Sequence, residues 1–74
     1  MNFPPCPRTN YRSNALADQG AKMHQDVMYI HKDTPNGDHG VIYEFMRKGT
    51  RWQWCGAGRA RYADKQIKTL FQIP

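Results

Sequence analysis

The sequence lacks the features of a membrane or secreted protein. No stretch of about 18 apolar residues, the length that a membrane-spanning helix needs, occurs anywhere in it. Residues 1–7 read Met-Asn-Phe-Pro-Pro-Cys-Pro, which is neither the basic start nor the apolar stretch of a secretory signal. We therefore expect a cytoplasmic protein with no membrane partner.

Cysteine is also scarce, since only Cys6 and Cys55 occur. A small secreted chain usually carries about four to eight cysteines in a disulfide framework, so we expect two free thiols here. Arginines near Cys55 offer a way to lower the pKa of its thiol. A chain this small forms few pockets that exclude water around a nucleophile, so we interpret Cys55 as a buried apolar filler.

Metal-binding and phosphate-binding motifs are missing as well. Zinc sites usually pair their ligands about two to four residues apart, and the five candidate ligands are more widely spaced: Cys6, His24, His31, His39 and Cys55. The stretch 56–58, Gly-Ala-Gly, has neither the third glycine of a dinucleotide loop nor a following Gly-Lys-Ser/Thr, and we interpret it as a β-bulge. We expect no metal, no cofactor, no catalytic residue and no enzymatic activity.

What the chain does contain fits one modest hydrophobic core, because 74 residues leave much of the surface in contact with water. The apolar fraction of 39% and the charged fraction of 23% are those of a globular protein. Residues 1–25 show no sustained period and hold one weakly helical patch, with Ser13 or Asn14 as a candidate cap. We predict a flexible or weakly helical arm over residues 1–25 and a single β-β-β-α domain over residues 26–74.

Three segments have the pattern of strands. Residues 26–32 are rich in β-branched and aromatic side chains, and a turn signal follows over residues 33–40. Residues 41–48 alternate, and a second turn leads to residues 51–62. There, strict alternation predicts two faces. The apolar face holds Trp52, Trp54, Gly56, Gly58, Ala60 and Tyr62, and the other holds Arg51, Gln53, Cys55, Ala57, Arg59 and Arg61.

The period then becomes that of a helix. Ala63, Ile67, Leu70 and Phe71 form one apolar stripe, and Asp64 is placed to cap its start. The stripe needs an apolar partner, and the face of Trp52 and Trp54 has the matching size. We predict an α+β fold in which a small three-stranded antiparallel sheet is packed by one C-terminal helix, with an irregular N-terminal arm and both tryptophans in the core.

The net charge of +5 is concentrated in the second half of the chain. Residues 13–46 carry five acids and two bases, whereas residues 47–74 carry seven bases and one acid. Arginine binds phosphate through two hydrogen bonds, so segregated arginines favour a polyanionic partner. We predict that the chain binds the backbone of nucleic acid, DNA or RNA, through an arginine-rich sheet face. The candidate residues are Arg47, Lys48, Arg51, Arg59, Arg61, Lys65 and Lys68.

Other functions fit the same features. The basic face is also consistent with an ordinary solvated surface. A small phage or mobile-element protein that inhibits or redirects a host protein would use such a face, or an open strand edge, to bind its partner. A third hypothesis is an enzyme subunit that is completed only by oligomerisation. The sequence leaves the oligomeric state open.

Overall fold

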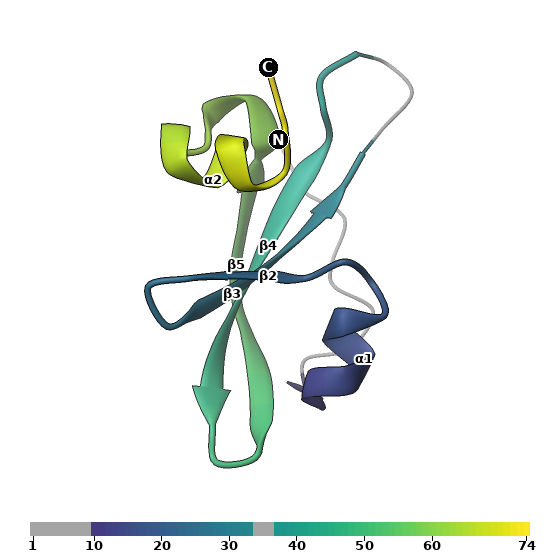
Figure 1. Cartoon of the computed structure of the whole chain (residues 1–74), viewed down its shortest axis with the longest axis vertical. Helices are drawn as coiled ribbons and strands as arrows, with labels where there is room; N and C mark the ends of the chain where they lie inside the picture. Colours follow the sequence, from purple (N-terminus) through teal and green to yellow (C-terminus); the bar gives the residue numbers. More distant parts are fainter. Residues whose placement is uncertain (1–9, 34–36) are drawn as a thin grey trace.

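The described part of the chain forms one five-stranded antiparallel sheet with two short helices (Figure 1). The computed structural model describes residues 10–33 and 37–74. In chain order the elements are β1 (Asn10–Tyr11), α1 (Ser13–Ala17), β2 (Lys22–His24), β3 (Val27–Lys32), β4 (Val41–Lys48), β5 (Arg51–Arg59), the 3-10 helix η1 (Ala60–Tyr62) and α2 (Lys65–Leu70). The spatial order of the strands is β1-β5-β4-β3-β2. The prediction of a three-stranded sheet packed by one C-terminal helix is therefore wrong.

The three central strands lie where the sequence predicts strands, although residues 60–62, expected in the last of them, form η1 instead. Residues 41–48 form β4 as predicted, with Val41, Tyr43 and Phe45 buried on one side. A two-residue turn then joins β4 to β5, and Gly49 adopts a positive φ of 63° in it, which glycine does without steric cost. None of the helices within residues 10–33 and 37–74 is long and apolar enough to cross a membrane.

Residues 10–24, expected in an irregular arm, instead supply β1, α1 and β2. Tyr11 pairs with Trp52 of β5, is 3% exposed, and meets the ring of Phe45 edge-on at 5.2 Å between centroids. At the other edge, β2 pairs with β3 through a turn in which Gln25 and Asp26 both have positive φ. Hairpin turns of this kind usually contain glycine or asparagine. Neither occurs at positions 25 and 26, so this turn could not be predicted from the sequence.

A bulge interrupts the pairing of β4 with β5. Phe45 pairs with Trp54, but the preceding residue, Glu44, pairs with Gly56, so Cys55 has no partner in the register. One extra residue reverses the side to which all later side chains of the strand point. Ala57, after the bulge, therefore lies on the same side of the sheet as Trp54, before it.

The sheet carries a hydrophobic cluster on each face. The first contains Tyr11, Leu16, Ile30, Val41, Tyr43, Phe45 and Trp52, and we call its side the tryptophan face. The second contains Ile42, Ala60, Ile67 and Ile73, and we call its side the opposite face. The apolar stripe of α2 packs on the sheet, but it covers the opposite face and not the tryptophan face as predicted, which α1 covers instead. The two helices lie toward opposite ends of the molecule (Figure 1).

Neither helix has the expected side-chain cap. Asp64 occupies the N-cap position of α2 without a capping hydrogen bond. Arg12 occupies that position in α1, again without a capping hydrogen bond from its side chain, and Ser13 Oγ instead accepts a hydrogen bond from Trp52 Nε1 at 2.9 Å. Trp52 is 3% exposed, so the prediction that it belongs to the core is confirmed, although α1 rather than α2 covers it.

This arrangement predicts different effects for two buried residues. Leu16→Ala should lower the free energy of unfolding by about 2–5 kcal/mol, because it leaves a cavity beneath α1. It should also shift the tryptophan emission of the native protein to longer wavelength. Ile67→Ala, the matched control on the opposite face, should destabilise the fold without that shift. Denaturant titration followed by fluorescence measures both effects, and a shift caused by Ile67→Ala instead would contradict the assignment of the faces.

Candidate nucleic-acid interface

The structure divides the seven candidate residues into three groups. Arg47, Lys48 and Arg51 lie at the β4–β5 turn, Arg59 and Arg61 lie at the far end of β5 and in η1, and Lys65 and Lys68 lie on α2. The β4–β5 turn and α2 are at opposite ends of the molecule, at the bottom and top of Figure 1. The prediction of one arginine-rich sheet face is wrong, because the bulge at Cys55 places Arg51 and Arg59 on different sides.

The cations at the β4–β5 turn project from both sides of the hairpin. Arg47 pairs with Trp52, so it lies on the tryptophan face. Its Nε donates a hydrogen bond to the Gly49 carbonyl at 3.2 Å, and its Cζ is 5.7 Å from the centroid of the Trp52 ring. Lys48 pairs with Arg51 on the opposite face. All three cationic side chains are exposed.

Arg12 joins this group although the sequence analysis did not identify it. It lines an open pocket of about 420 Å³ together with Ser13, Asn14, Thr50 and Arg51. These five residues bring two guanidinium groups, two hydroxyl groups and one amide together, and no carboxylate is among them. The pairing of β1 with β5 brings Arg12 close to the turn, and a two-residue strand has no period from which it could be predicted. We call Arg12, Arg47, Lys48 and Arg51 the hairpin end.

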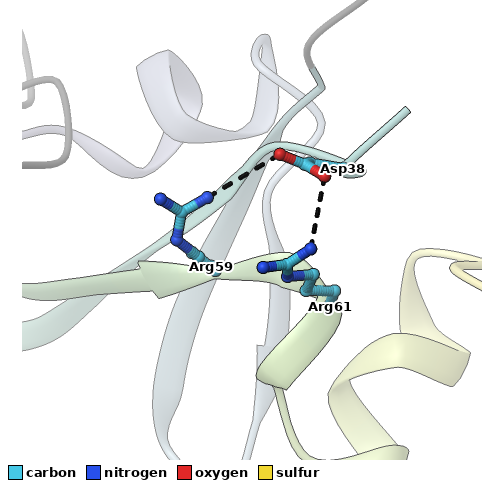
Figure 2. Close-up of polar contacts among 3 residues, drawn as sticks. All are labelled: Asp38, Arg59 and Arg61. Carbon is cyan, nitrogen blue, oxygen red and sulfur yellow. Dashed lines mark hydrogen bonds and ion pairs between the residues drawn. The ribbon is translucent and has the colours of Figure 1, made fainter. Parts of the chain in front are cut away.

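Arg59 and Arg61 share one carboxylate instead of facing solvent as a pair. Arg59 Nη1 lies 3.8 Å from Asp38 Oδ2, and Arg61 Nη1 lies 3.4 Å from Asp38 Oδ1 (Figure 2). Arg61 also places its Cζ 4.8 Å from the centroid of the Tyr62 ring. Asp38 is in the segment between β3 and β4, so the two arginines link that segment to the end of β5. The negative charge of Asp38 offsets one of the two positive charges that these arginines carry.

The α2 end of the sheet carries carboxylates. A pocket of about 210 Å³ between α2 and the opposite face is lined in part by Tyr29, by two carboxylates, Glu44 and Asp64, and by one cation, Arg59. Burial raises the pKa of the Tyr29 hydroxyl, and the negative charges of Glu44 and Asp64 raise it further. The two carboxylates outnumber the one cation in this pocket. Lys65 and Lys68 lie on α2, at the other end of the molecule from the hairpin end.

Cys55 is neither buried nor activated. As the extra residue of the bulge it is exposed, and its Sγ lies 3.4 Å from the Glu44 carbonyl, to which the thiol donates. Partial desolvation and the charge of Glu44 raise the pKa of this thiol, in contrast to the lowering that nearby arginines suggested. The interpretation as a buried filler is wrong because the bulge turns Cys55 outward. Cys6 lies outside the described residues.

The histidines do not gather into a ligand set. His31 Nε2 donates a hydrogen bond to the His39 carbonyl, and the His31 ring lies against Phe71. Within the part of the chain that the structure describes, no group of three or more His, Cys, Asp or Glu side chains is placed to hold a metal ion.

The environment of Cys55 makes its reactivity testable in a Cys6→Ser background. Because the raised pKa lowers the thiolate fraction near pH 8, iodoacetamide should modify native Cys55 more slowly than the same thiol in the urea-unfolded chain. Glu44→Gln should move the midpoint of the pH–rate profile to lower pH. A native thiol that reacts faster than the unfolded one would contradict this assignment.

Comparisons of the chain with protein-family models, with curated proteins and with solved structures find no match. The function is therefore inferred from the side chains and their geometry, and the hairpin end is the place where cations gather without a neutralising carboxylate in the pocket beside them.

Proposed function

We propose that the chain is a small, non-enzymatic module that binds the phosphate backbone of nucleic acid through the hairpin end. One observation carries this proposal. Exposed cations from two distant parts of the chain, Arg12 before α1 and Arg51 after the β4–β5 turn, line one pocket with two hydroxyl groups and no carboxylate.

The chemistry of the hairpin end suits phosphate oxygens. A guanidinium group donates two parallel hydrogen bonds to one phosphate, and hydroxyl groups such as those of Ser13 and Thr50 donate further ones. Each cation that neutralises a phosphate also releases counterions from the nucleic acid, which favours binding at low salt. Arg59 and Arg61 are not part of this proposed site because both pair with Asp38. Lys65 and Lys68 are not part of it because they lie on α2, at the other end of the molecule.

Other properties of the chain support a binding module over a catalyst. The pocket at the hairpin end is open and its five lining residues include no general base, and the exposed thiol of Cys55 has a raised pKa. The cytoplasmic location expected from the sequence would give such a module access to nucleic acid.

A host-protein partner remains the second candidate, and the edge of the sheet favours it. β2 lies at the end of the strand order, so no other strand of the described ranges pairs with its outer side. An extended segment of a partner protein would add to the sheet there through main-chain hydrogen bonds. Such a complex would form without nucleic acid and would not depend on the hairpin end.

The proposal predicts a steep dependence of binding on salt. Fluorescence anisotropy with labelled oligonucleotides should give an affinity that falls as salt rises, and the double variant Arg12→Gln/Arg51→Gln should reduce the slope of log affinity against log salt by about 2, one for each lost phosphate contact. The matched control is Lys65→Gln/Lys68→Gln, which removes the same charge from the other end of the molecule.

The control variant should keep the slope of the unmodified protein. Equal losses in the two double variants would show that only net charge matters and would overturn the assignment to the hairpin end. No binding to any oligonucleotide at low salt would overturn the proposed function itself.

A further inference from the structure

The hairpin of β4 and β5 continues beyond the neighbouring strands. β3 pairs with β4 only as far as Met46, and β1 pairs with β5 no closer to the turn than Trp52. Beyond these positions the pair Lys48–Arg51 and the turn at 49–50 have no strand beside them among the described residues. In Figure 1 the hairpin projects downward as a two-stranded ribbon with α1 beside it.

This ribbon carries cations on both of its faces. Lys48 and Arg51 are on the opposite face. Arg47 is on the tryptophan face, one pair nearer the sheet, where its partner Trp52 also pairs with Tyr11 of β1. A flat basic patch meets one row of phosphates, whereas a ribbon with cations on both sides can meet two rows at once. Such a ribbon fits a groove that has a phosphate backbone along each wall.

The dimensions of nucleic acids select among the grooves. The major groove of B-form DNA is about 12 Å wide and admits a two-stranded ribbon as it stands, whereas the minor groove, about 6 Å wide, must first be widened at a cost in deformation energy. The major groove of A-form RNA is too narrow for side chains to enter. Single strands are usually held by aromatic rings that stack on bases, and the ring nearest the turn, Trp52, is only 3% exposed.

We infer that the β4–β5 hairpin enters the major groove of B-form duplex DNA, with Arg47 directed to one flanking backbone and Lys48 and Arg51 to the other. The inference rests on the proposed function and adds its ligand and its mode of docking. The tip itself, Gly49 and Thr50, has small side chains and places little bulk between the base edges.

The first test compares ligands with the unmodified protein at one salt concentration. A DNA duplex should bind at least about tenfold more tightly than an RNA duplex or a single strand of the same sequence, because these lack an accessible major groove. A fourth ligand is the DNA duplex with glucose attached through 5-hydroxymethylcytosine. Its phosphates are unchanged, but its major groove is filled at the C5 positions, so its affinity should also fall by at least about tenfold.

The second test separates the two faces of the ribbon. Arg47→Gln changes one face and Lys48→Gln/Arg51→Gln changes the other; each should reduce the salt slope on the DNA duplex, by about 1 and about 2 respectively. Lys65→Gln is the matched control. Circular dichroism of each variant shows whether the fold is retained. If a variant does not fold, the first test still decides, because it uses the unmodified protein.

The outcomes test the groove inference and the proposed backbone binding separately. Equal affinity for the glucosylated and unmodified duplexes, or for DNA and RNA, would overturn the groove inference and leave backbone binding intact. If only the variants on one face reduce the salt slope, the groove inference would also be overturned, because the protein would then dock through a flat surface. Absence of binding to all four ligands at low salt would overturn both.

Discussion

The bulge at Cys55 decides which side chains of this protein meet. Before it, Trp54 pairs with Phe45, and after it, Gly56 pairs with Glu44. The extra residue allows Trp54 and Ala57 to contribute to the same cluster, although their separation would place them on opposite sides of a regular strand. It also places Gly58 beside Ile42 on the opposite face, where it lines the pocket next to α2. The bulge thus determines which face each residue of β5 after Cys55 joins.

The two clusters explain how so short a chain holds two helices in place. α1 has five residues and α2 has six, and helices of that length are not stable in water without packing. Each is held by a fully or nearly fully buried side chain, Leu16 in α1 and Ile67 in α2. The hydrogen bond from Trp52 to Ser13 also ties the start of α1 to β5. The position of Arg12, and with it the pocket at the hairpin end, is therefore a consequence of packing on the tryptophan face.

Sequence reasoning located the elements whose patterns are long and missed those whose patterns are short. β4 was predicted over its full length, because eight alternating residues leave one choice of face, and the apolar stripe of α2 was predicted because four residues repeat at helical spacing. β1 and β2 have two and three residues, too few for any period. A bulge was predicted at residues 56–58, next to its true place at Cys55, but the reversal of the faces was missed because glycine and alanine fit either face. Because of that ambiguity, Arg59 and Arg61 were predicted to lie on the same face as Arg51. Because β1 was not predicted, Arg12 was not included in the predicted site.

The distribution of charge along the molecule matters more to the proposed function than the net charge of +5. Asp38 pairs with Arg59 and Arg61, and Glu44 and Asp64 line the pocket at α2, whereas the cations of the hairpin end lie toward the other end of a molecule about 35 Å long. At physiological ionic strength, charges are screened over about 8 Å. Carboxylates at the α2 end therefore weaken the positive potential of the hairpin end very little, whereas at their own end they offset most of the positive charge that η1, α2 and the end of β5 carry. The same segregation that gives affinity would thus orient the encounter, so that the ribbon reaches the nucleic acid first.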